Sequence, residues 1–254
     1  MNLFYRTVGE GPPLIILHGL FGSADNWRPL ATRFAKFRKV YLVDQRNHGM
    51  SPHDNEFTYD AMVNDLLLFI KQHDLIKPDI LGHSMGGKVA MYFAVKYPDQ
   101  VNKIIVVDIA PKAYPVRHDE ILDGLKTLRV EDILTRQEID DVLAEIIESP
   151  RLRRFLLKNL KRNKYGFEWK MNLDVIYNKI ANLSIGLNKG DGFSHDTLFI
   201  RGSDSDYILD SDIKSISSHF PKAELVTIEN ASHWVHVEEP DALCLSVKEF
   251  LLKK

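Results

Sequence analysis

The sequence predicts one α/β domain in which a mostly parallel sheet carries helices on both faces and a helical cap is inserted between two strands. Three observations support this prediction. Short apolar runs alternate with longer helical patterns, a serine stands between glycines at a predicted strand-to-helix turn, and residues 111–195 contain only helical patterns. A chain of 254 residues is long enough to bury a full core.

Six short apolar runs are predicted to form buried parallel strands. They are rich in Val, Ile and Leu and are bounded by Gly, Pro, Asp or Asn, which is typical of strands that are covered on both faces. The runs are residues 14–17, 40–43, 79–81, 104–107, 198–200 and 225–228. A further strand, at residues 3–8, is expected to pair at the edge of the sheet.

Longer segments with helical periodicity connect these strands. They are residues 27–37, 58–73, 85–97, 210–220 and 240–251. Because strands and helices alternate along the chain, the helices are expected to cover both faces of the sheet.

Residues 111–195 interrupt the alternation. The segment shows helical patterns at residues 120–128, 136–148, 152–160 and 173–181, and no strand is predicted in it. A segment of this length is too long for an unstructured loop in a compact domain. It is therefore predicted to form a cap over the strand ends, within a single domain of residues 1–254.

The composition is that of an ordinary globular protein, with 44% hydrophobic and 27% charged residues. A net charge of −2 indicates no electrostatic footprint for nucleic acid. Near the N-terminus there is no signal-peptide pattern, and the apolar run at residues 14–17 is far too short to span a membrane. The single cysteine, Cys244, excludes an internal disulfide and favours a reducing, cytoplasmic location.

The motif Gly82-His83-Ser84-Met85-Gly86-Gly87 follows an apolar run and precedes a helical pattern. A nucleophile elbow needs this order of strand, sharp turn and helix, with the serine at the apex. Gly82 and Gly86 remove side chains that would clash where the strand and the helix pass closely. Ser84 is therefore the predicted nucleophile.

His233 is the predicted general base, because a serine hydroxyl is a weak nucleophile until a base takes its proton. His233 follows the last predicted strand, and the carboxyl ends of parallel strands meet at one edge of a sheet. His236 is an alternative base that could instead begin a helix or pack against the cap. His83 is expected to pack beneath the elbow, and His18 to brace its own turn.

A tetrahedral oxyanion needs two N–H donors. Met85, which begins the helix after the nucleophile, and Leu20, in the turn after the first central strand, are the predicted donors. Four aromatic residues are weaker candidates for an apolar substrate pocket, since each is equally consistent with a place in the core. They are Phe21, Tyr114, Tyr207 and Trp234. No pair of histidines stands at metal-ligand spacing beside carboxylates, so neither a metal nor a cofactor is predicted.

Taken together, these motifs resemble the α/β-hydrolase family over nearly the whole chain. Residues 44–52 and 107–111 are most similar to a YbfF-type subgroup of small bacterial carboxylesterases. The resemblance implies hydrolysis of small-molecule esters or acyl thioesters through a serine acyl-enzyme. The motifs that carry it are His18-Gly19, Asp44-x-Arg46-x-x-Gly49-x-Ser51, the elbow around Ser84, Gly202 and His233.

The acid of the triad departs from the family pattern. The family places it three residues after a glycine that is Gly202 here, and that position holds Ser205. Asp108 ends the fourth predicted strand after four apolar residues, so a carboxylate there needs a charged partner, which His233 would provide. Asp108 is the favoured acid, and Asp204 and Asp206 are the alternatives.

Two other functions remain open. The same fold could host a carbon–carbon bond hydrolase, a haloperoxidase or a lyase, or the chain could be a non-catalytic binding module, although the presence of Ser84 and His233 argues against the module. A basic cluster at residues 151–164 is interpreted as a solvated helix face, with an anionic substrate tail as the alternative. Arg46 and Arg117 are expected to pair with local acids, with a substrate anion as the alternative.

Overall fold

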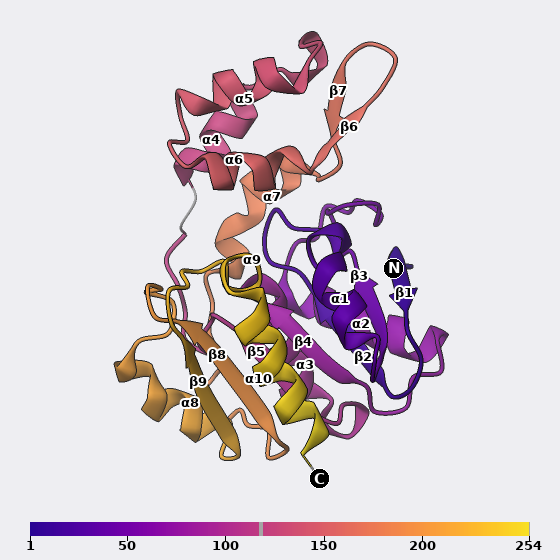
Figure 1. The fold of residues 1–254 in the computed structure, drawn as a ribbon, viewed down its shortest axis with the longest axis vertical. Helices are drawn as coiled ribbons and strands as arrows, with labels where there is room; N and C mark the ends of the chain where they lie inside the picture. Colours follow the sequence, from indigo (N-terminus) through magenta and orange to yellow (C-terminus); the bar gives the residue numbers. More distant parts are fainter. Residues whose placement is uncertain (117–118, 254) are drawn as a thin grey trace.

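A seven-stranded sheet forms the centre of the computed structural model, which describes residues 1–116 and 119–253 (Figure 1). The strand order is β1-β3-β2-β4-β5-β8-β9. The first strand pairs antiparallel with β3, and the other neighbours in this sheet are parallel. The strands are β1 (Tyr5–Val8), β2 (Pro13–Leu17), β3 (Lys39–Val43), β4 (Asp79–His83), β5 (Ile104–Val107), β8 (Thr197–Gly202) and β9 (Ala223–Ile228). The predicted mostly parallel sheet is confirmed.

Helices cover both faces of this sheet, as the alternation predicts. Successive strand residues point to opposite faces, so Leu14 and Ile16 of β2 join one core cluster and Ile15 and Leu17 join the other. The first cluster includes side chains of α1 (Arg28–Phe34) and α10 (Pro240–Leu252). The second includes side chains of α2 (Tyr59–Gln72), α3 (Met85–Lys96) and α8 (Ile213–His219).

Two short helical pieces near the C-terminal strands differ from the prediction. Residues 210–220, expected as one helix, begin as a 3-10 turn at Asp210–Asp212 and continue as α8. A short helix, α9 (Val235–Glu238), separates His233 from α10. The next helix begins at Pro240, where the missing N–H of proline costs no helical hydrogen bond.

The segment between β5 and β8 holds four α-helices and one hairpin in its described part. The helices are α4 (Asp119–Thr127), α5 (Arg136–Ala144), α6 (Pro150–Leu157) and α7 (Leu173–Lys179). The expectation that it contains no strand was wrong, because β6 (Leu160–Arg162) pairs antiparallel with β7 (Phe167–Trp169). The Asn163 side chain accepts the N–H groups of Tyr165 and Gly166, which stabilises the tight turn between them.

These inserted elements form a lobe at one end of the molecule, drawn in pink to orange above the sheet (Figure 1). Their buried side chains, which include Leu125, Leu143 and Leu156, belong to the core cluster on the α2 and α3 face. The lobe is therefore packed onto the sheet domain through a continuous apolar core.

Cys244 is a buried side chain of α10 within the other core cluster, which matches the packing expected of a small apolar residue. No helix in the described ranges is both long and apolar enough to cross a membrane.

Candidate active site

Ser84 lies at the turn between β4 and α3, where its backbone adopts φ 52° and ψ −116°. This conformation is rare for a residue with a side chain and is characteristic of strained functional turns. The backbone N–H of Ser84 donates to the carbonyl of Val107 at 3.0 Å, which ties the turn to β5. The local geometry is that of a nucleophile elbow.

Gly82 and Gly86 are required by the close approach of three elements. A Cβ atom on Gly82 would lie 2.1 Å from the carbonyl oxygen of Gly86. A Cβ atom on Gly86 would lie 2.3 Å from the carbonyl oxygen of Leu17. Both contacts involve backbone atoms that cannot move aside, so any side chain at either position would displace α3 from the sheet.

His233 and Asp108 are joined by a hydrogen bond of 2.8 Å between Nδ1 and Oδ2. The Asp108 side chain is fully buried at the end of β5, whereas the His233 side chain is partly exposed. The imidazole also stacks on the Tyr207 ring, with the centroids 3.8 Å apart and the planes 16° from parallel. Two contacts on different sides therefore hold this ring in one orientation.

Ser205, at the position where the family pattern places its acid, donates its hydroxyl to Oδ2 of Asp108. Oδ1 of the same carboxylate accepts the Gly202 N–H at 3.2 Å. Sequence reasoning treated Ser205 only as a missing acid and overlooked it as a partner of Asp108. Asp204 and Asp206 have exposed side chains, and Asp204 accepts the hydroxyl of Ser203.

Ser84 and His233 line one cavity of about 190 Å³. Phe21, Tyr207 and Trp234, three of the predicted pocket residues, also line it. Its remaining walls include Ile121 and Leu152 of the inserted lobe, together with Leu20 and His83. The lobe therefore lies over the carboxyl ends of the strands, where ligands bind in parallel α/β sheets.

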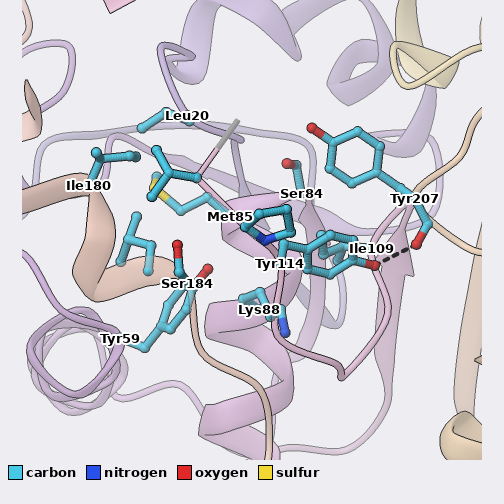
Figure 2. Close-up of a pocket in the computed structure, with 13 residues that line it drawn as sticks. Leu20, Tyr59, Ser84, Met85, Lys88, Ile109, Tyr114, Ile180, Ser184 and Tyr207 are labelled. Carbon is cyan, nitrogen blue, oxygen red and sulfur yellow. Dashed lines mark hydrogen bonds between the residues drawn. The ribbon is translucent and has the colours of Figure 1, made fainter. Parts of the chain in front are cut away.

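A second, smaller cavity of about 70 Å³ is also lined by Ser84 (Figure 2). Tyr114, the fourth predicted pocket residue, lies in its wall. The Tyr114 hydroxyl donates to the carbonyl of Tyr207 and accepts the N–H of Ala110, so the ring is held firmly in place.

The loop of Leu20 approaches Ser84 closely. A Cβ atom on Gly19 would lie 3.2 Å from the Cβ of Ser84, and Leu20 and Met85 both line the cavity in Figure 2. Phe21 donates its N–H to Nε2 of His48 at 3.3 Å. By contrast, the N–H groups of Leu20 and Met85 donate no hydrogen bond within residues 1–116 and 119–253.

Lys88 is a buried cation in the same cavity that sequence reasoning missed, although a lysine in an apolar helical pattern was the available signal. Its side chain is 1% exposed, and Nζ donates to the carbonyls of Lys112 and Ile185. These carbonyls belong to the two connections between the sheet domain and the lobe. Burial lowers the pKa of Lys88 to about 7. Both connections are thus attached to α3, the helix that follows Ser84.

His236, the alternative base, lies outside both cavities that contain Ser84. Its ring is buried and stacks on Trp27 with the centroids 4.5 Å apart. His83, expected beneath the elbow, is a buried side chain in the wall of the larger cavity, where its Nε2 donates to the carbonyl of His233 at 2.8 Å. His18 contacts the carbonyl of Gly19 through Nδ1, in agreement with its expected bracing role.

Arg46 is buried and pairs with Asp65, with 2.6 Å between Nε and Oδ2. The expected local ion pair is therefore present. Arg117, for which the same role was expected, lies outside the described residues.

The buried neutral histidines predict a loss of stability in acid. Burial lowers the pKa of His236 to about 3, and burial likewise lowers the pKa of His48 to about 3 and that of His18 to about 4. The unfolded chain binds protons on these rings below pH 6.5 whereas the folded chain does not, so the free energy of unfolding falls as the pH drops. At pH 5 each ring is expected to cost on the order of 2 kcal/mol.

Urea unfolding at pH 7 and pH 5 tests this expectation with His236→Phe, which keeps an aromatic ring against Trp27. The variant should lose less stability between the two pH values than the natural chain does. Val237→Ala, at an exposed residue of the same short helix, is the control and should keep the natural pH dependence. An unchanged acid sensitivity in His236→Phe would contradict the prediction.

Comparison with known proteins places this chain in a family. A family model described as the alpha/beta hydrolase fold matches residues 12–130. Esterase YbfF of Escherichia coli is 34% identical over 240 residues, which cover 94% of this chain and 92% of that protein. The sn-1-specific diacylglycerol lipase ABHD11 of Danio rerio is 36% identical, over 99% of this chain and 83% of that protein.

A solved structure of a marine microorganism esterase superimposes with a TM-score of 0.95 at 44% identity. The match covers 98% of this chain and 99% of that one. Since these relatives are more than 30% identical over nearly the whole length, the resemblance found in the sequence is confirmed. The chain belongs to the α/β-hydrolase family and is a carboxylesterase-type hydrolase.

Proposed function

We propose that this enzyme hydrolyses small carboxylic esters by two-step acyl transfer on Ser84. His233 is the general base and Asp108 is the acid that orients it. The observation that carries the proposal is the 2.8 Å hydrogen bond from His233 Nδ1 to a fully buried Asp108 carboxylate, beside the cavity that His233 shares with Ser84.

In the first step Ser84 Oγ attacks the substrate carbonyl and its proton passes to Nε2 of His233. Asp108 accepts the Nδ1–H of His233, which selects the tautomer with a free Nε2 and stabilises the imidazolium that forms. The N–H groups of Leu20 and Met85 donate to the oxyanion.

The tetrahedral intermediate collapses when His233 returns the proton to the leaving alcohol or thiol. A water molecule then takes the place of the alcohol. His233 takes a proton from the water as it attacks the acyl-enzyme, and then gives that proton to Ser84 Oγ as the carboxylic acid leaves, which restores both residues. The same sequence serves oxygen esters and thioesters, since both present an acyl carbon to Ser84.

In this proposal the chain is a single domain, and residues 111–195 form a cap that covers the substrate pocket. Phe21, Tyr207 and Trp234 line the larger cavity, and Tyr114 lines the smaller one, which supports an apolar acyl group. The volumes of about 190 and 70 Å³ favour a short acyl chain. The absence of an internal disulfide is in keeping with a cytoplasmic location.

A panel of p-nitrophenyl esters of graded chain length, with matched acyl thioesters, tests the proposal. Short-chain esters should give the highest kcat/KM, and a fluorophosphonate probe should label Ser84 in the natural enzyme. A trapped acyl-enzyme from the ester distinguishes this reaction from lyase chemistry on the same fold. Failure of the probe to label Ser84 would overturn the proposal.

A further inference from the structure

A second groove, of about 480 Å³, adjoins the larger cavity that contains Ser84. Leu152 and Trp234 line both spaces. The groove continues between α6 of the lobe and α9 of the sheet domain, with Phe155 and Trp234 in contact at a centroid distance of 4.4 Å. A substrate bound at Ser84 can therefore extend past Trp234 into this groove.

One face of α6, together with Lys158 directly after its last residue, supplies three cations to the groove. Arg151, Arg154 and Lys158 all line it, at the three- and four-residue spacing that places helix side chains on one side. The neighbouring Arg153 does not line the groove but pairs with Asp140, with 2.9 Å between Nε and Oδ1. The basic cluster in the sequence is thus divided between the lobe's own ion pairs and the groove.

Two of the three cations have no acidic partner. Arg151 pairs with Glu238, with 2.6 Å between Nη1 and Oε1. Ser232 also donates to Glu238 through its N–H and its hydroxyl, so this carboxylate is already satisfied. Across the described parts of the chain, no carboxylate lies within ion-pair distance of Arg154 or Lys158. The groove therefore carries a net positive charge.

We propose that this groove binds a phosphate group carried by the alcohol or thiol part of the substrate. The proposal rests on the proposed esterase function, because it requires the acyl carbon to lie at Ser84. With the acyl chain in the cavity around Ser84, the leaving group points past Trp234 toward α6. Guanidinium and ammonium groups complement phosphate oxygens, and a phosphate monoester with two charges matches the two unpaired cations.

The electrostatic effect of these cations reaches the residues behind the groove. Burial is the largest cause of the lowered pKa of His236, the neighbouring His233 is the next, and the positive charges of Lys158 and Arg151 lower it further.

Two matched substrate pairs test the proposal, because the members of each pair differ only in the phosphate. They are 1-butyrylglycerol with 1-butyrylglycerol 3-phosphate, and S-butyrylpantetheine with S-butyryl-4′-phosphopantetheine. In the natural enzyme the phosphorylated member should have the lower KM. The double variant Arg154→Ala/Lys158→Ala should raise that KM about tenfold and leave the KM of the neutral member within about twofold.

Lys164→Ala is the matched control, since it removes one exposed cation from the hairpin of the same lobe, away from the groove. It should leave the KM values of the phosphorylated and the neutral substrates unchanged. Added salt should raise the KM of the phosphorylated substrate alone, because screening weakens exposed charge pairs. The glycerol and pantetheine pairs then show whether the phosphate belongs to an oxygen ester or a thioester.

Two results would overturn the phosphate site. One is that, in each pair, the phosphorylated and the neutral substrate have equal KM values with the natural enzyme. The other is that the double variant raises the KM of the two substrates by the same factor. Either result leaves the esterase proposal intact, because the neutral esters are still hydrolysed. Failure of the natural enzyme to hydrolyse any of the four substrates contradicts the esterase function itself.

Discussion

Ser84→Ala is expected to reduce kcat by about a million-fold, the order of loss seen when a serine hydrolase loses its nucleophile. Alanine keeps the Cβ atom and removes only the hydroxyl, so the elbow at φ 52° should be unchanged. Because substrate contacts remain, KM should change little. The measurement is the turnover of p-nitrophenyl butyrate, together with labelling by a fluorophosphonate probe.

Ser184 offers a matched control, because this serine also lines the small cavity beside Ser84 (Figure 2). Ser184→Ala removes one hydroxyl from the same cavity and should retain kcat within a few-fold. Thermal unfolding of both variants separates a chemical effect from a folding defect. If the Ser84→Ala variant kept a substantial fraction of the natural activity, another group would have to attack the substrate.

Asp108→Asn is expected to reduce kcat by about ten-thousand-fold, as loss of the orienting acid does in triad enzymes. The amide has the shape of the carboxylate, but it cannot stabilise the imidazolium, and it favours the wrong tautomer of His233. The side chain is fully buried and tied to His233, Gly202 and Ser205, so the geometry should persist. Single-turnover kinetics with an activated ester measure the effect on chemistry.

Three further variants test the choice of acid. Asp204→Asn and Asp206→Asn change exposed carboxylates and should keep nearly natural turnover. Ser205→Ala removes one hydrogen bond to Asp108 and should cost about tenfold, the effect of one ordinary hydrogen bond. A larger loss in Asp204→Asn or Asp206→Asn than in Asp108→Asn would contradict the assignment of Asp108.

The alternating strands and helices were predictable because each element carries its own local pattern. Apolar runs of three or four residues and longer helical periods are visible without knowledge of the fold. The hairpin of β6 and β7 was missed because its strands are three residues long and follow a helical pattern directly. A pairing of that length depends on the Asn163 turn, which leaves little trace in periodicity.

By itself, the sequence determined the α/β class, and it located Ser84 at a glycine-flanked turn and His233 after the last strand. These features follow from residues that are neighbours in the chain. Only the tertiary structure decided which aspartate lies against His233, because Asp108 and His233 are 125 positions apart. It also revealed Ser205 as a donor to Asp108 and Lys88 as a link to both connections of the lobe.

The basic residues of α6, and Lys158 directly after it, also show what the sequence determines and what only the tertiary structure decides. Their charge can be read from the sequence. Whether a carboxylate pairs with a given cation depends on how other elements of the fold pack against it. Arg151 pairs with Glu238 and Arg153 with Asp140, while Arg154 and Lys158 line a groove beside the cavity that contains Ser84. Local patterns specify the elements, and the packing of distant elements specifies which charges and hydroxyls meet.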